Sequence, residues 1–159
     1  VQFEYLMHVL EAQGYQHYEI SNYALPGKRA VHNSNYWKGI PYLGIGPSAH
    51  SFDGESRQWN IANNIKYMKA VSVNELPFEK ETLTGSQKIN EQIMTSLRTM
   101  EGLNRTAITQ QLNEEQLIEW NDSLQHMQHE ALILIEEETI KLTQKGKLFG
   151  DYVAGELFV

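Results

Sequence analysis

The chain has 159 residues, with 13 Lys and Arg against 20 Asp and Glu, and its formal net charge is -7. A surface of that sign repels phosphate backbones, so we expect no nucleic acid among its partners. The absence of cysteine excludes disulfides, thiolate nucleophiles and cysteine-ligated iron–sulfur clusters on this chain. No apolar run reaches the roughly 18 residues of a transmembrane helix and no signal-peptide pattern is present, so we expect a cytoplasmic protein.

The first expected element is a helix over residues 1–13, which Gly14 ends as a C-terminal cap. Its apolar residues recur at helical spacing: Phe3, Leu6, Met7 and Leu10. No capping residue precedes Val1, so we interpret the chain as the C-terminal part of a longer polypeptide. Residues 15–23 contain several aromatic residues and stop before a Pro-Gly turn, which predicts one strand.

Glycine and proline punctuate the segment from Tyr18 to Asp53, which therefore predicts irregular loops and no regular helix. Within it His32, Tyr36 and Trp37 lie close together. Imidazole can bind heme iron and aromatic rings can cover the face of a tetrapyrrole, so these residues suit a porphyrin site. The alternative is that His32 bonds to loop backbone while the two aromatic residues anchor the loop to the core.

Residues 42–46 begin like a short buried strand, and the small residues after them allow a ligand or another backbone to come close. His50 would present a polar group at the mouth of such a site. Gly44 and Gly46 form a GxG pair without a third glycine, which is not a dinucleotide fingerprint. A tightly packed turn is an equally good interpretation.

The remaining residues predict a short helix, a linker and a mostly helical second unit. Helices are expected over residues 63–71, 86–100, 105–112, 116–135 and 143–157, with a strand over 139–142. Residues 72–85 contain Pro77 and mixed charges and are interpreted as the linker, with the boundary near 79–85. His126 and His129 could bind a metal only with further ligands, so a solvated polar face is expected there.

Three strings together resemble a known family: YEISNYALPG from Tyr18, HNxxYW from His32 and YLGIGPSAHS from Tyr42. They are similar to oxygen-independent coproporphyrinogen III oxidase-like proteins of the radical S-adenosylmethionine class. HNxxYW resembles the heme-chaperone branch, HemW, more than the coproporphyrinogen dehydrogenases. The family pattern has an arginine directly before the HN pair, whereas this chain has Ala30-Val31 there and Arg29 is displaced.

The resemblance implies an α+β fold. Residues 1–78 would be the end of a partial α/β (TIM-like) barrel, and residues 79–159 a mostly helical, winged-helix-like C-terminal domain. It also implies S-adenosyl-L-methionine and a 4Fe-4S cluster in the parent protein. The cluster ligands cannot be on this cysteine-free chain. An oxidoreductase activity would therefore belong to the parent, and this chain alone is not expected to be catalytic.

The resemblance also implies roles for individual residues. Heme- or substrate-binding roles fall on His32, Asn33, Tyr36, Trp37, His50 and Arg57, with His32 as the candidate ligand of heme iron. Cofactor-facing positions are Glu19, Ser21, Gly44 and Gly46. A strand that only packs is the alternative for Glu19 and its neighbours.

Three functions follow from these observations. In the first, the chain belongs to a HemW-like protein that binds heme or porphyrin and delivers heme to heme-accepting proteins. In the second, the parent is an anaerobic coproporphyrinogen III oxidase of porphyrin biosynthesis. In the third, the chain is a helical interaction domain without a ligand of its own.

Overall fold

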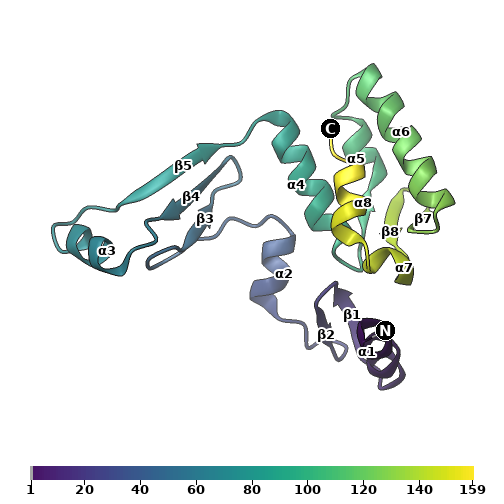
Figure 1. Ribbon diagram of the computed structural model, residues 1–159, viewed down its shortest axis with the longest axis horizontal. Coiled ribbons are helices and arrows are strands. Elements are labelled where there is room, and N and C mark those ends of the chain that lie inside the picture. Colours follow the sequence, from purple (N-terminus) through teal and green to yellow (C-terminus); the bar gives the residue numbers. More distant parts are fainter. Residues whose placement is uncertain (1) are drawn as a thin grey trace. The chain divides into compact units, whose positions relative to one another are not determined.

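The structure is a computed structural model that describes residues 2–159 (Figure 1). Its helices are α1 (Gln2–Ala12), α2 (Val31–Trp37), α3 (Asn64–Val71), α4 (Gly85–Leu97), α5 (Arg105–Thr109), α6 (Glu114–His129), α7 (Gln144–Lys147) and α8 (Gly150–Glu156). Its strands are β1 (Gln16–Glu19), β2 (Asn22–Ala24), β3 (His50–Phe52), β4 (Ser56–Asn60), β5 (Phe78–Thr82), β6 (Leu103–Asn104), β7 (Ile133–Glu136) and β8 (Thr139–Leu142). None of the helices within 2–159 combines the length and the apolar content of a membrane span.

The described chain divides into two compact units. Unit 1 contains the residues up to Lys38 together with Ser86–Val159, and unit 2 is Gly39–Gly85. Helices and small antiparallel sheets occur together, which confirms the predicted mixed α and β class. Residues 2–38 group with the helical residues 86–159, whereas the sequence groups them with 39–78. The assignment of 1–78 to a barrel end and 79–159 to a separate domain stays a prediction.

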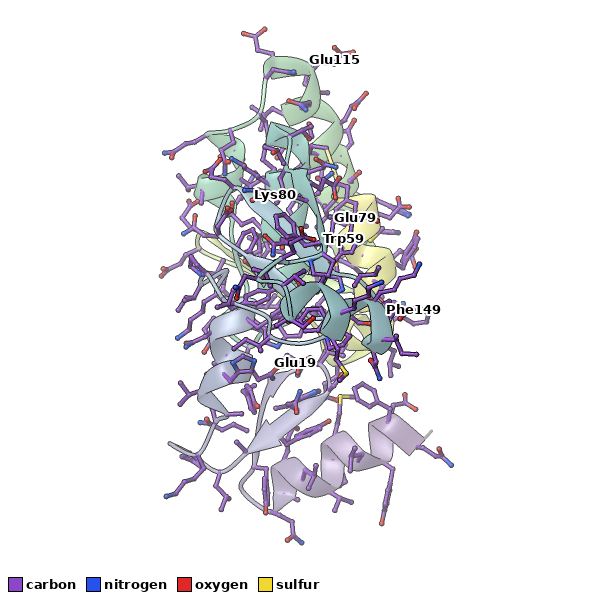
Figure 2. All side chains as sticks on the ribbon, turned by 90° about the vertical axis from the view of Figure 1, so that its left-hand side faces the viewer. Glu19, Trp59, Glu79, Lys80, Glu115 and Phe149 are labelled. Atoms are coloured by element: carbon purple, nitrogen blue, oxygen red, sulfur yellow. The ribbon has the colours of Figure 1, made fainter. Side chains whose placement is uncertain are left out.

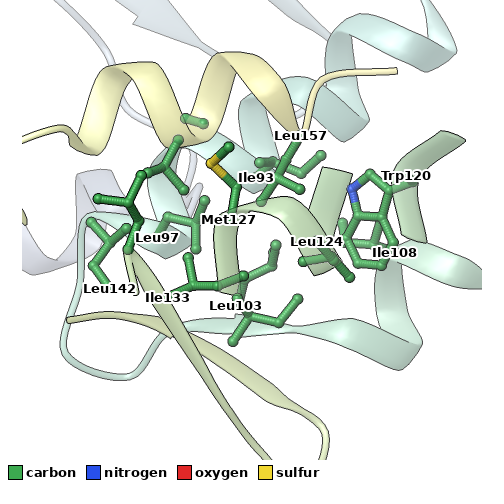
Figure 3. Packing of buried hydrophobic residues seen from close by; sticks show 14 of the residues in the cluster. Ile93, Leu97, Leu103, Ile108, Trp120, Leu124, Met127, Ile133, Leu142 and Leu157 are labelled. Atoms are coloured by element: carbon green, nitrogen blue, oxygen red, sulfur yellow. The ribbon is translucent and has the colours of Figure 1, made fainter. Parts of the chain in front are cut away.

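The hydrophobic core belongs to unit 1, among α4, α6, α8 and the sheet with strand order β6-β8-β7 (Figure 3). Helix α4 supplies Ile89, Ile93 and Leu97, which recur every four residues and so share one face. Helix α6 begins with a capping box, in which Asn113 and Gln116 satisfy each other's backbone N–H groups. The core thus follows from helical periodicity that the sequence shows directly.

Three predicted elements of unit 1 have different bounds in the structure. The predicted strand 15–23 is a hairpin of β1 and β2, because Glu19 accepts hydrogen bonds from the Ser21 N–H and the Asn22 side chain and closes a turn. Helix α6 ends at His129, because Ala131 has a positive φ of 56° and starts the turn into β7. The single last helix predicted over residues 143–157 is divided into two helices, α7 and α8.

Unit 2 is an antiparallel sheet of strand order β3-β4-β5 with helix α3 in the β4–β5 connection. Asn63 caps α3 by accepting a hydrogen bond from the Lys66 N–H. The predicted linker 72–85 instead contains β5, which pairs with β4 along its whole length. The buried side chains of this unit are Ser56 and Asn60, and none of its hydrophobic side chains is buried. Hydrogen bonding therefore determines its local structure.

We expect Leu97→Ala to lower the free energy of unfolding by about 2–5 kcal/mol, the usual cost of a cavity left in a packed core. Leu97 is 2% exposed and contributes to the core of unit 1. Urea unfolding followed by circular dichroism measures the change. Met94→Ala, on the same helix but 42% exposed, is the matched control and should change it by less than about 1 kcal/mol. Equal effects of the two substitutions would contradict the assigned core.

Candidate functional site

The HNxxYW string forms helix α2, where the sequence predicts an irregular loop. Glycine and proline flank residues 31–37 but do not occur within them, so this stretch can take helical dihedral angles. Lys38 ends the helix and Gly39 follows with a positive φ of 64°. A helix distributes the motif's side chains around its axis and thereby gives them different surroundings.

One side of α2 borders a cavity of about 470 Å³ in unit 1, here called the α2 cavity. Among its lining residues are Tyr18, Arg29, Trp37, Lys38, Ser96 and Glu101. His32 and Tyr36 are exposed and do not line it, and they lie one helical turn apart on α2. Of the four motif residues predicted to form one site, Trp37 alone lines the α2 cavity.

Charged groups gather at the α2 cavity. The Arg29 Nη1 donates to Glu101 Oε1 at 2.5 Å, and the guanidinium carbon lies 5.6 Å from the centre of the Tyr18 ring. Partial burial acts to raise the pKa of Glu101, but the hydrogen bond from Arg29 and the charges of Arg29 and Lys38 outweigh it and lower that pKa. Glu101 is therefore a carboxylate at neutral pH, held between two cations.

The Trp37 ring packs against a further cation, Arg98. The guanidinium carbon of Arg98 lies 5.2 Å from the centre of the indole, and its Nη1 donates to Asp151 Oδ1 at 2.7 Å. Within residues 2–159 the buried indole Nε1 of Trp37 and the buried amide Nδ2 of Asn33 have no hydrogen-bond partner. An unpaired buried donor costs about 1–3 kcal/mol, so the packing around α2 includes two unfavourable polar groups.

The predicted cofactor-facing residues of the β1–β2 hairpin lie in different environments. Glu19 is only 2% exposed, and its carboxylate accepts from the Ser21 N–H at 3.1 Å and from Asn22. Figure 2 labels Glu19 on this hairpin. The Ser21 side chain is exposed. The Glu19 oxygens that the sequence assigns to a cofactor thus bind the residues of their own turn.

His50 and Arg57 lie in unit 2. His50 is paired with Trp59 across β3 and β4, and their ring centres are 6.3 Å apart. Both rings border a cavity of about 390 Å³, and the Trp59 indole N–H donates to Glu79 Oε2 at 3.2 Å (Figure 2). Arg57 does not border this cavity and lies opposite Glu81 in the β4–β5 register. The structure therefore does not bring His50 and Arg57 into one cavity.

Gly44 packs closely against backbone, whereas the space beside Gly46 is open. A Cβ at position 44 would lie 2.1 Å from the His50 carbonyl oxygen, so only glycine fits there. Gly46 has a φ of 107°, and its carbonyl accepts from the Asn60 amide at 2.9 Å. The contact that requires glycine at position 44 is with another stretch of backbone.

The structure adds residues that the sequence does not single out. The sequence marks Arg29 only as displaced from the family pattern. Its ion-pair partner in the structure is Glu101, 72 positions away in the chain. Lys38 lines the α2 cavity, and Arg98 packs against Trp37, which forms part of the cavity wall. No local spacing indicates such pairs, because a loop and the end of a distant helix bring them together.

A buried histidine of β1, His17, contacts the half-buried Lys147. The His17 Nε2 donates to the Ile20 carbonyl at 2.9 Å, and its Nδ1 accepts from Lys147 Nζ at 3.1 Å. The ring stacks on Tyr23 with 4.1 Å between centres. Burial is the largest effect and lowers the pKa of His17. The hydrogen bond with Ile20 opposes it, and the Lys147 charge lowers the pKa further against weak opposition from Glu11 and Glu19. His17 is therefore neutral at pH 7.

Other histidines do not form a metal centre in the described chain. His126 and His129 lie exposed near the end of α6. Across residues 2–159, His, Asp and Glu side chains nowhere gather in a group of three that could hold a metal ion.

Comparison with known proteins finds relatives that are named heme chaperones or radical S-adenosylmethionine proteins, although no family model matches the chain. It is 29% identical to the heme chaperone HemW of Bacillus subtilis (strain 168), over 96% of this chain and 41% of that protein. It is 25% identical to the mitochondrial radical S-adenosyl methionine domain-containing protein 1 of Danio rerio, over 91% of this chain and 35% of that protein.

A solved structure is similar in fold. Coproporphyrinogen III oxidase (HemN) from Escherichia coli, a radical SAM enzyme, matches with a TM-score of 0.72 and 21% identity, over 98% of this chain and 40% of that one. The chain thus spans between 35% and 41% of the length of these three proteins. At 21% identity the likeness shows the fold alone.

We expect the free energy of unfolding to decrease as the pH falls below about 6.5, the unfolded value for His17, because its folded pKa is lowered. The unfolded state binds the proton more readily there, whereas above that pH neither state binds it. Urea unfolding at pH 7.5 and 5.5 measures the loss, and His17→Gln should reduce it. His129→Gln, at an exposed position, is the control. An equal pH dependence in wild type and His17→Gln would contradict this assignment.

Proposed function

We propose that this chain, which is homologous to the HemW heme chaperones, forms the heme-holding part of such a protein, with His32 as an axial ligand of heme iron. The observation that carries the proposal is that the His32 imidazole is exposed on α2 and makes no hydrogen bond within the described chain. An accessible imidazole nitrogen is a group that heme iron binds.

The neighbouring residues support a flat ligand at this helix. Tyr36 is 42% exposed, and its ring packs edge-on against Trp37 with 5.1 Å between centres. Tyr36 can cover one face of a tetrapyrrole, while Arg98 and the Trp37 indole fix the helix in unit 1. Asn33 supplies a buried amide donor on the same helix. His50, whose ring lies beside that of Trp59, is a second candidate imidazole for heme iron. It serves as the comparison for His32.

The family also implies S-adenosylmethionine and a 4Fe-4S cluster. The chain has no cysteine, so none of its residues can ligate that cluster. The alternative parent, an anaerobic coproporphyrinogen III oxidase, is supported by likeness in fold, whereas several of the sequence relatives are named heme chaperones. Heme holding by residues of this chain is therefore the favoured function. Heme-accepting protein partners and a cytoplasmic location are further predictions of it.

The fold prediction in its finer form is part of the proposal. A winged-helix-like arrangement after residue 79 is supported by the order α4, β6, α5, α6, β7 and β8, in which the β7–β8 hairpin pairs with β6. The assignment of residues 1–78 to the end of a partial barrel is supported by the fold likeness. Neither assignment is needed for the heme site on α2.

We expect His32→Ala to weaken heme binding about tenfold or more, at least about 1.4 kcal/mol, because an axial ligand is lost. Titrating the chain with heme and following the Soret band measures both the affinity and the ligation state. His129→Ala, at an exposed position on α6, is the control and should bind heme as the wild type does. His50→Ala tests the second imidazole. Unchanged affinity and Soret spectrum in His32→Ala would reject His32 as the ligand.

A further inference from the structure

We propose that the α2 cavity binds the carboxylates of tetrapyrrole side chains, through Arg29 and Lys38, with Glu101 as an internal carboxylate that a ligand displaces. The inference rests on the proposed function, because it takes a tetrapyrrole as the ligand and adds the residues that recognise its acidic groups. It concerns different residues from the iron ligand.

Charge is the first argument. The chain carries a net charge of -7, which repels a dicarboxylate ligand at long range. The α2 cavity is lined by two cations, Arg29 and Lys38, against the single carboxylate of Glu101. A locally positive cavity in an acidic chain selects for anionic groups, and a guanidinium binds carboxylates in a forked geometry.

The state of Arg29 is the second argument. Its Nη1 contacts Glu101, while its Nη2 has only a long contact of 3.4 Å to the Gln16 side-chain oxygen besides a contact to Met100. The Glu101 side chain is 58% exposed, and an ion pair with such an exposed member is weak and easily replaced. Glu101 thus occupies the position of a ligand carboxylate without holding it firmly.

The shape and the walls of the cavity are the third argument. Its volume of about 470 Å³ lies within the range of small-molecule sites. Tyr18 and Trp37 contribute aromatic surface, and Ser34, Asn35 and Ser96 contribute polar groups. A cavity with aromatic walls and two cations fits an aromatic ligand that carries carboxylates, which describes a porphyrin with propionate side chains.

The test uses a porphyrin without iron, so that histidine ligation plays no part. The 159-residue chain is titrated with metal-free deuteroporphyrin IX and with its dimethyl ester, and porphyrin fluorescence anisotropy gives each dissociation constant. We expect the free acid to bind about tenfold more tightly than the ester, because the ester cannot pair with Arg29.

Two substitutions are expected to act in opposite directions. Arg29→Gln should weaken binding of the free acid about tenfold and abolish the difference between acid and ester. Glu101→Gln should strengthen binding of the acid about threefold, because it removes the competing carboxylate. A general loss of structure would weaken both. Arg105→Gln, whose side chain donates to Asn121, is the control and should bind as the wild type does.

Equal binding of acid and ester, or weaker binding in Glu101→Gln, would overturn the inference. Its failure can be told apart from failure of the proposed function. Heme titrated into His32→Ala tests the iron ligand, whereas metal-free porphyrin titrated into Arg29→Gln tests the cavity. If only His32→Ala weakens binding, the proposed function stands and the cavity is rejected. If only Arg29→Gln weakens binding, the cavity stands and His32 is rejected as the iron ligand. A chain that binds neither heme nor porphyrin rejects both.

Discussion

Two backbone hydrogen bonds join the N-terminal hairpin to the end of α4, and the α2 cavity depends on them. The Ile20 N–H donates to the Arg98 carbonyl at 3.0 Å, and the Met100 N–H donates to the Tyr18 carbonyl at 3.1 Å. They connect residues about 80 positions apart in the chain and make residues 2–38 part of unit 1. The same connection places Tyr18 and Ser96 on the wall of one cavity.

Side-chain packing reinforces this junction. Ile20 packs against the core of unit 1, and a Cβ at position 150 would lie 2.6 Å from its Cδ1, so Gly150 gives Ile20 the space it needs. Glu19 beside it is buried, yet its oxygens accept hydrogen bonds from the turn that follows, which removes the penalty for burying a carboxylate. Unit 2, by contrast, buries no hydrophobic side chain among residues 39–85.

The sequence predicts those parts of the fold that depend on local patterns. The helices expected over residues 86–100 and 63–71 are present as α4 and α3, because periodicity and capping act over a few residues. The sequence does not predict helix α2, because glycines and prolines interrupt the segment on either side of it. The sequence does not predict strand β5 either, because all its residues are exposed. Its pairing with β4 stabilises it in place of hydrophobic burial. The Arg29–Glu101 pair joins residues 72 positions apart, which no local pattern can predict.

The proposed displacement of Glu101 also limits how tightly a ligand is held, which fits the proposed role in delivering heme. A carboxylate that competes for Arg29 lowers the affinity of every ligand carboxylate by the free energy of the internal pair. It also keeps Arg29 paired after the ligand leaves, so that release does not strand a half-buried cation. An uncompeted Arg29 would hold propionates longer and slow delivery. The proposed transfer therefore requires a weak Arg29–Glu101 pair, because a stronger internal pair would exclude the ligand altogether.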